Sequence, residues 1–194
     1  TVVGVEATTI KRIEKFAPRL KKVKVYGGDY EKVVRKYDTK DTAFFLDPPY
    51  PGYNVDVGEG EFDEERFFKL LKSLKGRFLI TYGIRGKFPA LVKGSDFWSK
   101  RIRTRRSIAH MRGVGGSSVL TQLLVANYEP TTKAHDELVL DDWDGALDEG
   151  ADDVEKAQPF GTFGGSFHYA MRIVLLIPAH KTYVEPFAGA AAVL

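Results

Sequence analysis

The stretch Thr42-Ala-Phe-Phe-Leu-Asp-Pro-Pro-Tyr50 decides the fold class. Its first five residues form a short apolar run, which is typical of a strand buried on both faces of a parallel sheet. The strand must stop at Asp47, because the two prolines that follow lack backbone N–H groups and keep the chain extended. In open α/β sheets, ligands bind at the carboxyl ends of such strands. The stretch therefore predicts both a central strand and a site.

Segments with helical and strand-like patterns alternate on both sides of this stretch. Before it, residues 24–26 predict a short strand, and Asp29 is the expected N-cap of a helix that ends near Tyr37. After it, the sequence predicts helices over 62–75, 84–92 and 168–177 and strands over 77–82, 98–104, 119–128 and 182–185. This alternation predicts an α/β sheet covered by helices.

The chain has 194 residues, which fits one domain, and 43% of them are hydrophobic. We expect residues 1–130 to form the catalytic part of this domain, residues 131–160 an acidic linker, and residues 161–194 a second, cofactor-binding part of the same fold. The linker carries ten acidic side chains and two lysines. Subtracting this charge of −8 from the total of +3 leaves +11 on the other residues. The strong positive charge outside the linker suits a polyanionic partner. The alternative is that it reflects only ordinary lysines on the surface.

The chain contains no cysteine. Disulfides, thiolate metal sites and a cysteine nucleophile are therefore excluded. The four histidines are His110, His135, His168 and His180, and they are too scattered to predict a metal site. No apolar run approaches about 18 residues and no signal peptide is recognisable, so we expect a cytoplasmic protein without membrane contact.

The residues Asp47-Pro48-Pro49-Tyr50 can bind a ligand as well as end a strand. The Asp47 carboxylate and the Pro48 carbonyl can both face outward as acceptors, and an exocyclic amino group offers two donors to such a pair. Tyr50 provides a flat face on which a base can stack. The alternative is a strand that merely ends in a rigid turn with a packed tyrosine.

A second candidate site follows the predicted strand over 182–185. Gly189 and the alanines beside it would let the backbone approach a ligand closely, as the first turn of a nucleotide-binding sheet requires. Plain packing is the alternative for such a turn.

The densest basic run covers residues 100–106. In a strand, Arg101, Arg103 and Arg105 share one face, and with Arg106 they suit contact with phosphates. A solvated edge strand guarded by charge is the alternative.

These segments resemble the DNA adenine methylase (Dam-type) family. The tetrapeptide 47–50 is similar to its catalytic motif, and Glu185-Pro-Phe-Ala-Gly189 looks like its cofactor loop. Gly164-Gly165 resembles the other cofactor motif of the family. The segment 28–30 is similar to the one that lies against the cofactor's adenine. The stretch 101–129 is similar to the closing strands of the family.

The resemblance implies a Rossmann-like, S-adenosylmethionine-dependent methyltransferase that methylates N6 of a flipped adenine in double-stranded DNA. The implied catalytic residues are Asp47, Pro48, Pro49 and Tyr50. The implied cofactor-binding residues are Asp29, Tyr30, Asp47, Phe163, Gly164, Gly165, Glu185, Pro186, Phe187, Ala188 and Gly189. The implied DNA-binding residues are Arg101, Arg103, Arg105 and Arg106.

Two departures from the family pattern stand out. The motif order is permuted, with the catalytic motif near the N-terminus and the cofactor loop at the C-terminus. The strand that would carry the ribose-binding acidic residue, and the target-recognition segment, would follow Leu194 and are expected to be absent. Ser166 also stands where a lysine is often found. The sequence thus predicts a fold that is circularly permuted or incomplete.

Three alternatives follow from these departures. The chain could be an incomplete fragment or a non-catalytic DNA-binding remnant, or a second chain could complete its site. Methylation of N4 of cytosine is the nearest enzymatic alternative. Methylation of C5 of cytosine is excluded, because it needs a cysteine thiolate.

Overall fold

The computed structural model describes residues 21–49, 62–105, 119–130 and 170–187, together with Pro18 and Pro51. The strands are β1 (Thr42–Leu46), β2 (Arg77–Gly83), β3 (Trp98–Arg105), β4 (Val119–Ala126) and β5 (Thr182–Val184). The helices are α2 (Tyr30–Tyr37), α3 (Glu64–Ser73), α4 (Phe88–Lys93) and α5 (Ala170–Leu176).

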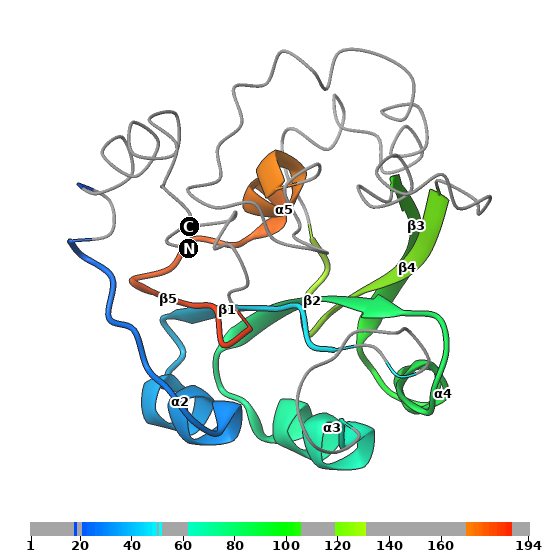
Figure 1. Ribbon diagram of the computed structural model, residues 1–194, viewed down its shortest axis with the longest axis horizontal. Coiled ribbons are helices and arrows are strands. Elements are labelled where there is room, and N and C mark those ends of the chain that lie inside the picture. The colour runs from blue at the N-terminus through cyan, green and yellow to red at the C-terminus, as the bar shows by residue number, and fades with distance from the viewer. Residues whose placement is uncertain are drawn as a thin grey trace, which may run out of the picture.

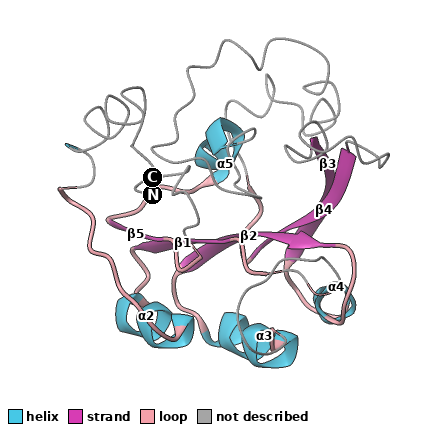
Figure 2. Ribbon diagram, viewed as in Figure 1, coloured by secondary structure: helices cyan, strands magenta, loops and turns pink. Residues whose placement is uncertain are grey.

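The described strands form one five-stranded sheet in the order β3-β4-β2-β1-β5. β1 lies parallel to both β2 and β5, whereas β4 is antiparallel to β2 and to β3. Helices α2, α3 and α4 lie on one face of the sheet and α5 on the other (Figure 1). The colouring by secondary structure shows the same three layers (Figure 2). The predicted α/β sheet covered by helices is confirmed.

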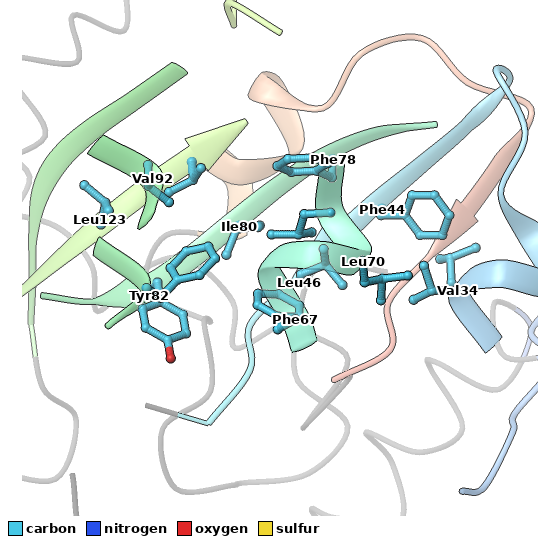
Figure 3. Packing of buried hydrophobic residues seen from close by; sticks show 14 residues of the cluster. Val34, Phe44, Leu46, Phe67, Leu70, Phe78, Ile80, Tyr82, Val92 and Leu123 are labelled. Carbon is cyan, nitrogen blue, oxygen red and sulfur yellow. The ribbon is translucent and has the colours of Figure 1, made fainter. Parts of the chain in front are cut away.

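The larger part of the core lies between the sheet and helices α2, α3 and α4. Phe67 and Leu70 of α3 belong to one buried cluster with Phe44, Leu46 and Ile80 of the sheet (Figure 3). The first turn of α3 is stabilised by its N-cap, because the Asp63 carboxylate accepts a hydrogen bond from the Arg66 backbone N–H at 2.9 Å. The apolar face of this helix closes the core beneath the two central strands.

The second part of the core lies under α5. Ile173 and Leu176 pack with Phe45 of β1 and Leu79 of β2. Tyr128, just after β4, donates a hydrogen bond from its hydroxyl to the backbone carbonyl of Leu176 at 2.8 Å. Burial raises the pKa of the Tyr128 phenol, so the hydroxyl stays protonated and remains a donor. Helix α5, far along the chain, is thus fixed to the sheet by packing and by a partly buried hydrogen bond.

Most of the predicted elements are present with bounds that differ by a few residues. The strand predicted over 24–26 is wrong, since this segment is irregular and Val25 is 90% exposed. The helix predicted from residue 84 begins at Phe88, because residues 84–87 form a turn in which Gly86 has a φ of +88°. The predicted acidic linker over 131–160 lies outside the described residues.

Among the helices that the structure describes, none is long and apolar enough to cross a membrane.

Candidate active site

The two central parallel strands bring Asp47 and Thr81 side by side. Leu46 of β1 pairs with Ile80 of β2, so the next residue on each strand is Asp47 and Thr81. The Thr81 hydroxyl donates a hydrogen bond to Oδ1 of Asp47 at 2.6 Å. Because side chains alternate along a strand, both project from the face that carries Phe45, Leu79 and α5.

The next parallel strand adds a second carboxylate at the same edge of the sheet. Glu185 follows β5 directly, and the Tyr183 hydroxyl donates to its Oε2 at 3.0 Å. Burial raises the pKa of the Glu185 carboxyl to about 7, against the hydrogen bond from Tyr183, and the negative charge of Asp47 adds to the rise. The two carboxylates therefore repel each other across the ends of β1 and β5.

An aromatic cluster borders this edge on the side of α2 and α3. The ring centroids of Tyr30 and Phe187 lie 5.0 Å apart, and that of Phe62 lies 5.9 Å from Tyr30 and 6.0 Å from Phe187. Phe67 closes the cluster from below, 6.0 Å from Tyr30. Tyr30 and Phe187 are only partly buried, so each leaves some ring surface available to a flat ligand.

Arg66 of α3 connects this cluster to the start of α2. Its guanidinium donates from Nε to Glu31 and from Nη2 to Asp29, both at 2.7 Å. The same group lies 5.5 Å from the centre of the Tyr30 ring. The hydrogen bond from Arg66 holds the pKa of the Asp29 carboxyl below its usual range. The pKa of the Glu31 carboxyl is lowered first by Arg35 and then by Arg66. Arg66 thus fixes α3 against the turn that carries Tyr30.

Asp29 was expected to bind the cofactor, and the structure engages both of its oxygens within the protein. Oδ1 accepts the backbone N–H of Glu31, which makes Asp29 the N-cap of α2. Oδ2 accepts the guanidinium of Arg66. Its visible role is to begin α2 with Tyr30 in place, and contact with a cofactor stays a prediction.

The other predicted site residues divide into placed and unplaced ones. Pro48 is buried and Pro49 partly buried directly after Asp47, and Pro186 follows Glu185. The predicted residues that lie outside the described ranges are Tyr50, Phe163, Gly164, Gly165, Ala188, Gly189 and Arg106.

The basic row predicted for DNA contact lies on β3, at the far side of the sheet from β5. Arg101 and Arg103 are exposed while Ile102 between them is 2% exposed, which is the expected alternation of a strand. Arg105 is the last residue of β3.

Two residues at the site were not found by sequence reasoning. Thr81 left a detectable signal, because its hydroxyl interrupts the apolar run of β2. It follows Ile80, the residue of β2 that pairs with Leu46 of β1. Arg66 left none, because its partners Asp29 and Glu31 lie 37 and 35 residues away in the chain.

Comparison with known families identifies the chain. A family model described as D12 class N6 adenine-specific DNA methyltransferase matches residues 4–105, just over half of the 194 residues. The chain belongs to this family. The match includes α2, β1, α3, β2, α4 and β3, and so includes Asp47 and Thr81. No match was found among curated proteins.

Members of the D12 class are DNA adenine methyltransferases that use S-adenosylmethionine as methyl donor. The described residues fit this cofactor in two respects. Its purine needs a partly exposed aromatic surface, which Tyr30 and Phe187 provide. Its cationic sulfonium suits an edge where Asp47 and Glu185 raise the negative potential. The chemistry of the side chains at this edge therefore agrees with the family.

Proposed function

We propose that this chain methylates N6 of adenine in double-stranded DNA, at a site where β1, β2 and β5 end. The observation that carries this proposal is the parallel pairing of β5 with β1, in the register Phe44–Val184. Through this pairing, the turn over 185–187, from a segment beyond the family match, lies at the same sheet edge as Asp47.

The target amino group would be held by Asp47 and by the backbone carbonyl of Pro48. The nitrogen of an exocyclic amine is a poor nucleophile because its lone pair is delocalised into the ring. Two acceptors, one of them a carboxylate, localise electron density on that nitrogen as it attacks, and they stabilise the positive charge that develops there. Pro48 and Pro49 keep both acceptors in a fixed, extended backbone. Tyr50 would then stack on the extruded base.

The methyl donor would be held beside these acceptors. Tyr30 and Phe187 would contact its purine, and Glu185 and Pro186 would lie next to its charged part. Phe163, Gly164, Gly165, Ala188 and Gly189 would complete the site, and Asp29 would act through the position of Tyr30. S-adenosylmethionine supplies an electrophilic methyl group when bound. The chain's own residues orient the nucleophile and provide a partly buried, negatively charged surface.

The order of these segments supports a circularly permuted methyltransferase. In the Dam-type order the cofactor loop precedes the catalytic motif, whereas here β5 follows β1 in the chain and still pairs with it. The pairing of two strands depends on their register and not on their order in the chain, so both orders build the same edge.

DNA would approach from the edge that carries Asp47, with phosphates bound by basic side chains. Arg101 and Arg103 on β3 are exposed on one face and suit this contact. Arg105 and Arg106 are expected to contribute to it. Binding of this kind weakens steeply as salt increases, because counterions are released from the DNA.

The experiment combines calorimetry of S-adenosylmethionine binding with detection of N6-methyladenine in duplex DNA. Asp47→Ala should lower the methylation rate by about 10²- to 10³-fold while the protein still binds the cofactor. Gly189→Val should block the cofactor loop and abolish binding. The matched control is Asp41→Ala, since Asp41 lies at the opposite end of β1 and forms an exposed ion pair with Lys181.

Two results would contradict the proposal. One is a folded protein that binds no S-adenosylmethionine. The other is an Asp47→Ala variant that methylates adenine as fast as the unchanged protein. Formation of N4-methylcytosine in place of N6-methyladenine would show that the target base is cytosine and not adenine.

A further inference from the structure

The hydroxyl of Thr81 is buried in a place where an apolar side chain would be expected. Thr81 is 0% exposed and lies in β2 between Ile80 and Tyr82, both also fully buried. Valine has nearly the same shape and avoids the cost of burying a hydroxyl. The hydrogen bond to Asp47 offsets that cost, which gives the threonine a reason to be here.

The hydrogen bond between the Thr81 hydroxyl and the Asp47 carboxylate is short. The distance of 2.6 Å between Thr81 Oγ1 and Asp47 Oδ1 falls in the short range typical of hydroxyl to carboxylate bonds. The donor is stiff, because a β-branched residue in a strand has few χ1 rotamers and the backbone of β2 is paired on both sides.

The Asp47 carboxylate, which accepts this hydrogen bond, is less restricted in its side-chain torsions than Thr81. The terminal torsion of an aspartate is broad, so its carboxylate plane rotates unless a partner holds it. When Glu185 is ionised, its negative charge also repels that of Asp47. A fixed donor on the neighbouring strand opposes that rotation.

We propose that Thr81 is a positioning residue that holds the Asp47 carboxylate in the orientation in which it accepts a hydrogen bond from the target amino group. This inference rests on the proposed function, because it needs Asp47 to act on the base. Thr81 itself touches neither the base nor the methyl donor and acts through Asp47.

The test compares Thr81→Val and Thr81→Ser with the unchanged protein in steady-state methylation of duplex DNA. Thr81→Val should lower kcat by about 10- to 100-fold, since a small misorientation of a reacting group has an effect of this size. The KM for DNA and for S-adenosylmethionine should stay within about 3-fold of the values of the unchanged protein, because Thr81 contacts neither substrate in the ground state. Thr81→Ser keeps the donor and should recover most of kcat.

The matched control is Thr42→Val, at the opposite end of β1. Thr42 is 2% exposed and donates its hydroxyl to the Tyr37 carbonyl at 2.6 Å, so it is also a buried threonine with a short hydrogen bond. Its loss should lower the melting temperature and leave kcat unchanged. A melting curve for each variant separates loss of fold from loss of orientation.

A double variant tests whether Thr81 acts through Asp47. In the Asp47→Ala background, Thr81→Val should cause no further loss of kcat, because the group that it orients is gone. A folded Thr81→Val variant with unchanged kcat, a Thr81→Ser variant as slow as Thr81→Val, or additive losses would each overturn the inference. In all three cases, an Asp47→Ala variant that is slowed as predicted would leave the proposed function standing. An Asp47→Ala variant as fast as the unchanged protein would overturn both.

Discussion

At the scale of single residues, Glu185 is the ionisable group whose environment in the described part of the chain has the clearest consequence for stability. Its carboxyl sits at the end of β5, where burial raises its pKa from 4.5 to about 7. The folded protein therefore prefers the protonated form. Between about pH 4.5 and 7 it binds more protons at this position than the unfolded chain does, so the free energy of unfolding falls as the pH rises through this window.

The variant Glu185→Gln should remove the loss of stability that ionisation of the buried Glu185 carboxyl causes. A shift of this size corresponds to roughly 3 kcal/mol once both states are ionised, so at pH 8 the variant should unfold at a higher urea concentration than the unchanged protein. At pH 4.5 and below, the two should differ little. Urea unfolding between pH 4.5 and 8 measures the effect.

The matched control for this prediction is Glu65→Gln, since Glu65 is exposed and pairs with the exposed Lys87. It should leave the pH dependence unchanged. Equal pH dependence of Glu185→Gln and the unchanged protein would show that Glu185 ionises normally in the folded state.

The residues of the site differ in how far the sequence could predict them. Asp47 was predictable because its signal is local: an apolar strand followed at once by an acidic residue and two prolines. For Thr81 only the hydroxyl within an apolar run was visible, and its partner could not be predicted, because it depends on the register between two strands that are joined by a whole helix. Arg66 depends on the packing of α3 against α2, and no local pattern encodes that contact.

At the scale of elements, the turn between β2 and α4 is built around the buried carboxylate of Glu64. This group accepts hydrogen bonds from the Tyr82 hydroxyl at 2.9 Å and from the backbone N–H groups of Lys87 and Phe88 at 2.7 and 2.8 Å. A Cβ atom on Gly86 would lie 2.6 Å from its Oε1. The carboxylate thus explains why α4 begins at Phe88, a start that the helical pattern of the sequence did not predict.

The variant Glu64→Ala should leave these three donors without their acceptor. We expect a loss of about 3 kcal/mol in the free energy of unfolding, because unsatisfied buried polar groups are costly. Hydrogen exchange should also speed up at the amides of Lys87 and Phe88. Glu65→Ala, the neighbouring exposed residue, should change neither quantity, and normal protection of both amides in Glu64→Ala would refute this account of the turn.

The junction between α3 and β2 allows no side chain at Gly76. A Cβ atom there would lie 2.7 Å from the Phe44 ring and 2.9 Å from the Thr42 carbonyl oxygen. Gly76→Ala should therefore destabilise the protein by about 1–3 kcal/mol through overpacking. Gly94→Ala is the control, because the nearest atom would be 3.8 Å away, and thermal melting of both variants checks the difference. Equal melting temperatures would contradict the predicted clash.

At the scale of the whole molecule, the sheet combines segments from distant parts of the chain. The alternation of helices and strands predicted the α/β class and most element bounds. The strand order could not be predicted, because the parallel pairing of β5 with β1 is set by tertiary packing and leaves no local pattern. The packing of α5 over Phe45 and Leu79 is part of that same long-range assembly.

The attachment of α5 can be tested with two neighbouring residues. Ile173 is fully buried against the sheet, whereas Val174 is 45% exposed. Ile173→Ala should cost about 2–4 kcal/mol through the cavity it leaves. Val174→Ala should change the free energy of unfolding by about 0.5 kcal/mol or less. Urea unfolding measures both, and a similar small effect at both positions would show that α5 does not pack as described.

The pairing of β5 with β1 also has a consequence during synthesis on the ribosome. Asp41, directly before β1, and Lys181, directly before β5, form an ion pair although they are 140 residues apart in the chain. Until β5 has been translated, one edge of β1 therefore lacks the strand that pairs with it in the folded protein. β1 carries Phe44 and Phe45, which are fully buried in the folded protein. At about 5–20 residues per second the delay before β5 is translated lasts roughly 7–30 seconds. During that interval the nascent chain exposes an apolar strand edge to aggregation and to chaperones.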